Sequence, residues 1–376
     1  MDAVLRADHI GSFLRPPELL EAAAEVEQGR RDPATLTELE DRAILQVLDL
    51  QRDAGIGIFT DGEYRRRWYS GAWDDSIAGL VRTHEGELSA PGMWQGRHHA
   101  LAEATASEVA PSYVAAEKVR LARRLAGAES GFLREHAPGP YKITLTGVTQ
   151  PAQRWFRTGT TEAVYPDWRA LRDDLLEILR QEVVTLVAEG AAYVQLDSLA
   201  YVIQLAPGNE DRLRRSGMDP ASLLGEIIAS DNAALAPARE AGVTTALHMC
   251  RGNNRSSWAT EGSYERIAEQ AFDELQVDRL LLEYDTERAG GFEPLRFLPA
   301  DKVVVLGLVS SKEPELESPD GLAHRIDEAT RYVPLERLAL SPQCGFASTR
   351  AGNMLTWDDQ RRKLELVVEV ARQVWG

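Results

Sequence analysis

The sequence predicts a (β/α)8 TIM barrel with a long insertion after the second strand. Three observations support this fold. Short apolar runs that end in polar or small residues alternate with long amphipathic stretches, as in parallel β/α units. Eight such runs occur along the 376 residues with no break in composition. No Gly-x-Gly-x-x-Gly follows the first run, which disfavours the alternative, a doubly wound dinucleotide-binding sheet.

The expected elements follow the chain in order. Glycines stop the pattern after three amphipathic stretches, at Gly55, Gly190 and Gly242, the residue type that most often follows a helix. Strands are expected at residues 4–10, 56–61, 142–145, 193–197, 244–248, 280–283, 303–308 and 338–340. The clearest helices are expected at residues 34–54, 168–189, 220–241, 264–275 and 357–375.

Residues 65–140 do not follow the alternation. They are rich in Trp, Gly, Arg and His, and one helix is expected at residues 112–125. An insertion this long after a barrel strand is typical of a lid or a binding segment, and an aromatic flap that only stabilises the fold is the alternative. Around it, we expect residues 1–376 to form a single barrel domain.

Composition excludes several classes of function. The chain has 42 Lys and Arg against 59 Asp and Glu, a net charge of −17, which disfavours nucleic acid as a partner. No apolar run approaches the roughly 20 residues that cross a bilayer, so no membrane partner is expected. The N-terminus lacks the pattern of a signal peptide, and two cysteines exclude a disulfide scaffold. We expect a cytoplasmic protein, whose oligomeric state the sequence leaves unknown.

Four metal-binding residue types stand at the ends of the later strands. His248 and Cys250 are two residues apart on an extended chain, so their side chains point the same way. Glu283 ends the sixth strand, and Cys344 follows the eighth. The ends of parallel barrel strands share one rim, so these four side chains make a sensible tetrahedral zinc set. The alternative is a hydrogen-bonded core histidine with two inert cysteines.

The ligand set also predicts the chemistry. Zn²⁺ with two thiolates and one carboxylate has a formal charge of about −1, which makes a poor activator of water. It suits a substrate thiol, which loses its proton on the metal although its free pKa is about 8.5. Glu283 is the harder and more weakly held ligand, so it is expected to give way to the incoming sulfur. A zinc-bound thiolate would then attack an electrophilic carbon.

At these residues the sequence resembles the family of cobalamin-independent methionine synthases. The segments 248–250, 282–283 and 342–346 look like the zinc site of the C-terminal catalytic barrel and of its short single-domain relatives. The resemblance covers nearly the whole chain, without the large N-terminal half of the full-length synthase. It implies an S-methyltransferase that makes methionine from homocysteine, with Zn²⁺ as cofactor and a methylated folate or another methyl carrier as donor.

The resemblance also implies substrate-binding residues. Ile10 and Ser12 resemble the segment after the first strand whose backbone holds homocysteine in the family. Glu63 matches a glutamate that binds the amino-acid ammonium group, and Asp197 matches an aspartate that binds the same molecule. Trp155 lies in a segment similar to the one that packs on the folate. Turn, cap and core roles are the alternatives for each.

The sequence departs from the family at two catalytic positions. Ser198 replaces an acidic residue after Asp197, and no histidine occurs in the seventh-strand segment where the family places its proton donor. Because a folate nitrogen must be protonated before it releases a methyl group, a general acid is needed, and Lys312 and His9 are the candidates.

Three arginines at residues 65–67 stand out in so acidic a chain. Arg65 is a candidate to receive a carboxylate, phosphate or sulfonate of the substrate, and a solvated surface is the alternative. With a sulfonate, the chain would be an epoxide–coenzyme M transferase of the same superfamily. A zinc-binding paralogue without turnover is the alternative of another class. A zinc hydrolase is disfavoured, because such sites are rich in histidine.

Overall fold

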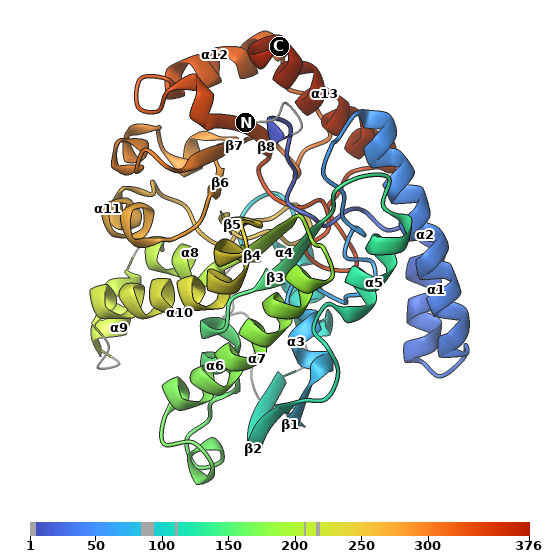
Figure 1. Ribbon diagram of the computed structural model, residues 1–376. Coiled ribbons are helices and arrows are strands. Elements are labelled where there is room, and N and C mark those ends of the chain that lie inside the picture. The colour runs from blue at the N-terminus through green and yellow to red at the C-terminus, as the bar shows by residue number, and fades with distance from the viewer. Residues whose placement is uncertain (1–4, 84–93, 110–111, 207, 216–218) are drawn as a thin grey trace.

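The computed structural model describes residues 5–83, 94–109, 112–206, 208–215 and 219–376 (Figure 1). Six strands form one parallel sheet in the order β3-β4-β5-β6-β7-β8, which is also their order along the chain. The bounds of the six strands are β3 Lys142–Thr146, β4 Tyr193–Asp197, β5 Thr244–Met249, β6 Arg279–Glu283, β7 Val303–Val309 and β8 Leu338–Pro342.

The first two expected strands are extended segments that pair with the sheet through single bridges. Ala7 bridges Leu340 of β8, and Phe59 bridges Tyr141 just before β3. Residue 4, the expected start of the first strand, lies outside the described residues. The prediction of regular strands at these two positions is therefore wrong in detail, although both segments occupy the expected places at the sheet edges.

The two extended segments also face each other. The threonine Oγ1 of Thr60 donates to the Gly11 carbonyl at 2.7 Å, and the backbone nitrogen of Phe13 donates to the Gly62 carbonyl at 3.2 Å. An apolar cluster contains residues from both extended segments and from strands β4 to β8. Its members are Ile10, Ile58, Tyr193, Ala246, Leu281, Val303, Val305 and Ala339. The eight positions thus form a TIM-like barrel, which confirms the predicted fold class.

Helices cover the outside of the sheet (Figure 1). Five of them begin at an Asp, Ser or Thr side chain that accepts a hydrogen bond from a first-turn backbone N–H, which satisfies a group that the helix itself cannot. The helices around the barrel are α1 Pro17–Glu27, α2 Pro33–Ala54, α6 Thr149–Trp155, α7 Trp168–Ala188, α8 Leu199–Leu205, α9 Asn209–Arg215, α10 Pro220–Glu240, α11 Glu265–Glu274, α12 Pro319–Ala329 and α13 Trp357–Trp375. Short 3-10 turns lie at Thr161–Ala163, Glu287–Ala289, Glu293–Phe297 and Leu335–Arg337.

The insertion after the second segment has its own structure. It contains α3 Gly71–Ser76, β1 Ile77–Thr83, α4 His99–Val109, β2 Ser112–Leu121 and α5 Gly127–His136. β1 and β2 pair antiparallel and project from the barrel (Figure 1). The predicted helix at residues 112–125 is therefore wrong, because pairing with β1 overrides the helix propensity of the Ala, Glu and Lys residues in this stretch.

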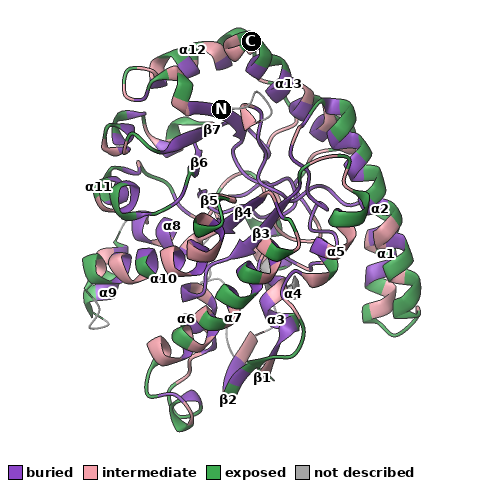
Figure 2. Ribbon diagram, in the orientation of Figure 1, coloured by how far each residue is buried: buried purple, intermediate pink, exposed green. Residues whose placement is uncertain are grey.

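The sheet is buried on both faces, as expected for a parallel sheet under helices (Figure 2). Every residue of β3, β6, β7 and β8 is buried, and β7, with the sequence VVVLGLV, is apolar throughout. Among the described residues, no helix is both long and apolar enough to span a bilayer.

Candidate functional site

A cavity of about 130 Å³ lies at the carboxyl ends of the barrel strands. Its wall takes residues from the ends of both extended segments, β4, β5 and β8, and from the insertion. The lining residues that carry reactive groups are Ser12, Glu63, Asp197, His248, Cys250 and Cys344. The cavity thus brings together residues that are far apart in the sequence, on the rim where barrel active sites form.

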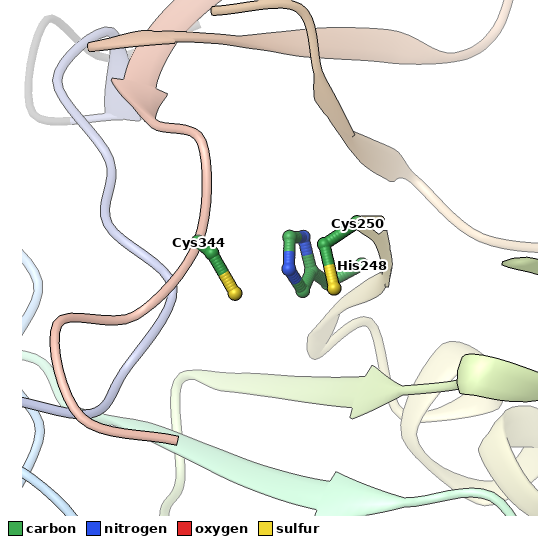
Figure 3. Close-up of side chains that lie close together, drawn as sticks. All are labelled: His248, Cys250 and Cys344. Atoms are coloured by element: carbon green, nitrogen blue, oxygen red, sulfur yellow. The ribbon is translucent and has the colours of Figure 1, made fainter. Parts of the chain in front are cut away.

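One wall of the cavity holds a cluster of His248, Cys250 and Cys344, which we call the thiol side (Figure 3). One ligand atom from each residue lies within 4.8 Å of the other two. His248 and Cys250 come from the end of β5, and Cys344 comes from the loop after β8. One imidazole nitrogen and two sulfurs at this separation can hold a single thiophilic ion such as Zn²⁺.

The neighbouring strand orients the His248 ring. The Nδ1 atom lies 3.1 Å from the Leu281 carbonyl of β6, which can only accept a hydrogen bond. Nδ1 therefore carries a proton, so in the neutral ring form that binds metals the free lone pair is on Nε2. Nε2 is buried without a hydrogen-bond partner among the described residues. A buried, unpaired ring nitrogen beside two sulfurs is the arrangement that a metal ion would complete.

The two thiols interact directly, with opposite effects on their pKa values. Their mutual hydrogen bond lowers the pKa of Cys250 and raises the pKa of Cys344 well above its ordinary value. The positive charge of Lys312 further favours the Cys250 thiolate. The surroundings of Cys250 thus favour the thiolate form that metal binding requires.

The loop after β5 is shaped to present Cys250. The Arg251 guanidinium folds back onto the Gly262 carbonyl at 2.7 Å and stacks on the Tyr264 ring, 3.9 Å from its centroid. Gly252 follows with a φ of +88°, and a Cβ atom there would lie 2.9 Å from that of Ala259. Only glycine fits this turn, which lets the Gly252 N–H donate to the Cys250 sulfur at 3.3 Å.

Glu283 is buried at the end of β6 but does not belong to the three-residue cluster. Its Oε2 atom accepts the backbone N–H of Arg251 at 2.7 Å. Its Oε1 atom pairs with Arg288, at 3.0 Å from Nε and 2.8 Å from Nη2. Its negative charge partly opposes the lowering of the Cys250 pKa by Cys344, so the two groups are close enough to interact.

Another part of the wall, which we call the carboxylate side, carries Glu63 and Asp197, and Asp197 is paired with His248 in the register of β4 and β5. Glu63 has a φ of 60°, a left-handed conformation that few non-glycine residues adopt and that often marks a functional site. Its Oε1 atom accepts from the Thr144 hydroxyl at 2.7 Å and lies 3.6 Å from the Arg66 guanidinium. Burial raises the pKa of Glu63 to about 7, and the charge of Asp197 adds to this effect.

Asp197 ends β4 and is oriented by its neighbour Gln195. The Gln195 amide donates to the Asp197 carboxylate at 2.7 Å and to the Ile10 carbonyl at 2.8 Å. Burial raises the pKa of Asp197, and the interaction with His248 partly offsets this rise. Gln195 thereby ties one carboxylate of the cavity to the backbone of the first segment.

Ser12 lies against the loop that carries Cys344. A Cβ atom on Gly345 would lie 2.0 Å from the Ser12 hydroxyl, so this approach requires glycine. The Asn253 amide donates to the Gly345 carbonyl at 2.7 Å, whereas its Oδ1 atom is buried without a partner among the described residues. The thiol and carboxylate sides meet at these residues.

The insertion supplies the aromatic part of the wall, through Trp68, Tyr69 and Trp94. Tyr69 donates its hydroxyl to Gln150 at 2.6 Å and its backbone N–H to Ser348 at 2.8 Å. Trp94 is followed by Gln95, whose backbone pairs with that of Trp258 in the loop after β5. The insertion therefore lies against the site.

Two residues predicted to bind substrate do not line this cavity. Trp155 is fully buried in the apolar core at the end of α6. Arg65 pairs with Glu40 at 3.3 Å and Asp41 at 2.5 Å on the outer side of the insertion. It is the next residue, Arg66, that reaches the interior, where it pairs with Glu63 and Glu129.

The two predicted proton donors are buried next to the cavity without lining it. His9 contacts the Ile58 carbonyl through Nε2 at 2.9 Å, and burial with the charge of Lys142 lowers its pKa to about 3. The Nζ atom of Lys312 has no hydrogen-bond partner among the described residues, and its charge lowers the pKa of Glu283.

Sequence reasoning missed Arg66, Asn253, Tyr69 and Gln150. Arg66 was visible only as one member of an arginine run, and nothing in the sequence separated it from its neighbours. Asn253 follows the His248-Met249-Cys250 segment by three positions, so its nearness to the metal motif was the one available signal. Tyr69 and Gln150 reach the site through the way the insertion folds against the barrel, for which the sequence has no local signal.

Comparison with known proteins places this site in a family. The family model described as "Cobalamin-independent synthase, Catalytic domain" matches residues 162–373. The Bacillus subtilis proteins YxjH and YxjG are 34% and 35% identical to this chain, over 99% and 98% of it and over 95% and 94% of their own lengths. A methionine synthase of Pyrococcus abyssi is 25% identical over 91% of this chain and 86% of its own length.

Solved structures show the same fold. A Listeria monocytogenes protein described as a vitamin-B12-independent methionine synthase has a TM-score of 0.73 at 25% identity, covering 99% of this chain and 98% of its own. A B12-independent methionine synthase from Shewanella, in complex with selenomethionine, has a TM-score of 0.73 at 18% identity. That structure covers 98% of this chain and 97% of its own.

Proposed function

Because the chain belongs to the family of cobalamin-independent synthase catalytic domains, we propose that it transfers a methyl (or alkyl) group to a thiol with the help of a zinc ion. Homocysteine is the proposed acceptor and methionine the product. The observation that carries this proposal is the cavity itself, which joins a cluster of three metal-ligand side chains to two carboxylates across one small space.

The thiol side fits a zinc ion on three counts. His248, Cys250 and Cys344 offer one nitrogen and two sulfurs within 4.8 Å of each other. The His248 Nε2 atom is buried and unpaired among the described residues, and Nδ1 is held by Leu281 as in many metal-binding histidines. These three residues would hold the ion, with Glu283 as a fourth candidate. A bound zinc ion would keep the substrate thiol deprotonated and nucleophilic near neutral pH.

The carboxylate side fits the ammonium group of an amino acid. Glu63 and Asp197 both line the cavity, burial raises the pKa of each, and the charge of Asp197 raises that of Glu63 further. A cationic group between them would relieve this repulsion. We propose that Glu63 and Asp197 bind the ammonium group, with Ile10 and Ser12 beside the rest of the amino-acid end. The chain's own residues thus orient homocysteine with its sulfur toward the thiol side.

The same lining argues against coenzyme M as the thiol. Among the described residues, neither arginine nor lysine lines the cavity. Arg65, the residue predicted for a sulfonate, pairs with Glu40 and Asp41 elsewhere. A sulfonate placed against Glu63 and Asp197 would be repelled, so the geometry favours an amino-acid thiol.

We propose that the insertion is a lid over the donor. Trp68, Tyr69 and Trp94 form a wall that can stack on a flat ring or exclude water from a small methyl carrier. Of the two candidates for the proton donor, Lys312 is favoured, because its ammonium group is unpaired and near the thiol side, whereas the His9 imidazole is neutral.

The test is a product assay on zinc-loaded protein. Homocysteine is mixed with a methylated folate or with a simpler methyl donor, and coenzyme M is mixed with an epoxide in parallel. The proposal expects methionine in at least one homocysteine reaction and no product from coenzyme M. A protein with one zinc per chain that forms no thioether in any reaction would be the non-catalytic paralogue, and the proposal would be wrong.

A further inference from the structure

The side chain of Arg288 holds Glu283, the one predicted metal ligand that lies outside the three-residue cluster. The Glu283 carboxylate is fully buried. Its Oε2 atom accepts the Arg251 N–H, its Oε1 atom pairs with Nε and Nη2 of Arg288, and the charge of Lys312 also favours the ionised carboxylate. A carboxylate with such partners has a strong alternative to a metal ion.

Arg288 is held in place independently of Glu283. Its Nη2 atom donates to both oxygens of Asp285, at 2.8 and 3.0 Å, and its backbone carbonyl accepts from Gly262 at 2.8 Å. Its guanidinium stacks on Trp258, 4.8 Å from the ring centroid. Since these contacts remain when Glu283 moves, the arginine is a fixed receptor to which the carboxylate can return.

We infer that Arg288 is a positioning residue that competes with the metal for Glu283 and so keeps a coordination place available for the substrate sulfur. This inference rests on the proposed function, because it presupposes a metal ion on His248, Cys250 and Cys344. It adds that the carboxylate is exchanged between two defined partners. The expected consequence is weaker metal binding but easier access for the thiol than in a protein that lacks the arginine.

Trp258 connects this arginine to the insertion. The backbones of Trp258 and Gln95 form two hydrogen bonds, at 2.8 and 3.2 Å. A Cβ atom on Gly96 would lie 2.5 Å from the Trp258 ring, so the two segments are in close contact. Arg288 thus contacts Trp258, which contacts the insertion beside Trp94. The proposed exchange of Glu283 between Arg288 and the metal would therefore take place next to the proposed lid.

The test is a double-mutant cycle with Co²⁺ as the probe. Wild type, Arg288→Gln, Glu283→Gln and the double variant are titrated with Co²⁺ and then with homocysteine, with absorption spectra recorded throughout. We expect Arg288→Gln to bind Co²⁺ about tenfold more tightly and to need about tenfold more homocysteine for the sulfur-to-metal band. The double variant should lose both effects, because no carboxylate is left to compete.

Controls keep the inference falsifiable. Arg296→Gln removes an arginine from an exposed pair with Glu265 and should match wild type. If Arg288→Gln does not fold, Arg288→Lys is the substitute, because it keeps the positive charge but cannot donate two parallel hydrogen bonds. It should change the Co²⁺ and homocysteine affinities in the same direction, by a smaller factor. Unchanged titrations in the arginine variant, or the same change with and without Glu283, would overturn the inference alone. Absence of Co²⁺ binding in all four proteins would overturn the proposed function as well.

Discussion

The two sides of the cavity hold their polar groups in opposite ways. On the thiol side, the His248 Nε2 atom is buried with no partner among the described residues, and the interaction with Cys344 lowers the pKa of Cys250. On the carboxylate side, Glu63 and Asp197 already have partners in Thr144, Arg66 and Gln195. The first side thus offers a ligand atom without a partner, whereas the carboxylates of the second side already accept hydrogen bonds.

This difference separates the two binding events. A metal ion should bind to the thiol side in the absence of substrate, because its ligands are preorganised there. An amino acid should bind to the carboxylate side in the absence of metal, because the ammonium group relieves repulsion that the protein already carries. Variants on one side should therefore change binding on that side more than binding on the other side.

The largest effect is expected for Cys344→Ser. Loss of one of two thiolates should weaken zinc binding at least about 100-fold, since a hydroxyl is a far poorer zinc ligand. Competition with a chromogenic chelator measures the affinity. Ser348→Ala, which removes the hydroxyl 3.9 Å from the Cys344 sulfur, is the matched control and should keep the metal. Full zinc affinity in Cys344→Ser would remove this residue from the site.

The carboxylate side is tested by Glu63→Gln with methionine as ligand, because methionine has the amino-acid end but no free thiol. Loss of the charged partner should weaken methionine binding by about 100-fold, or roughly 2–3 kcal/mol. Calorimetry measures the affinity, and zinc content should stay at the wild-type level. Glu226→Gln, in a pair with Arg169 and Arg172 between α7 and α10, is the control. Equal methionine affinity in Glu63→Gln would place the ammonium group elsewhere.

The pH dependence of methionine binding tests whether the ionised form of Glu63 binds the ammonium group. The pKa of Glu63 is raised from 4.5 to about 7, first by burial and then by Asp197 and Glu129, against the charge of Arg66. The unliganded carboxyl group is therefore protonated below about pH 7, and binding an ammonium group requires its ionised form. Methionine affinity should fall by up to tenfold for each pH unit below about 7. The methionine affinity of Glu63→Gln should not change in this pH range. If it falls in the same way, a group other than Glu63 is titrating.

The free protein should show the linked effect on stability. A carboxyl group with a raised folded-state pKa binds more protons in the folded state than in the unfolded state between pH 4.5 and about 7. The contribution of Glu63 to the free energy of unfolding is thus fully present below pH 4.5 and is lost as the pH rises through about 7. Saturating methionine should restore it at pH 8, as denaturant unfolding with and without ligand would show.

The smallest effect is expected at the junction of the two sides. Gly345→Ala puts a methyl group within 2.0 Å of the Ser12 hydroxyl, so the first segment must shift. We expect about tenfold weaker methionine binding with zinc retained. Gly131→Ala, in α5 with open space around it, is the control and should be neutral or slightly stabilising. Loss of zinc in Gly345→Ala would mean that the two sides are not independent.

The sequence predicted the regular part of the barrel well, since β4 and α13 have the expected bounds and β3, β5, β6, β7 and β8 differ by one or two residues. Buried parallel strands and capped amphipathic helices have local signals. The first two segments and β2 were predicted less well, because single bridges and the pairing with β1 depend on distant partners. His248, Cys250 and Cys344 were found because strand ends share a rim, whereas Arg66 and Arg288 act through contacts that local sequence does not encode.

The central claim is that His248, Cys250 and Cys344 hold one thiophilic ion. X-ray absorption at the zinc edge of protein loaded with one zinc per chain tests it directly. The structure predicts sulfur neighbours at about 2.3 Å together with a nitrogen neighbour at about 2.0 Å. Replacement of Cys344 by Ser should remove part of the sulfur signal. A shell of oxygen and nitrogen alone, with the same spectrum in wild type and variant, would contradict the account.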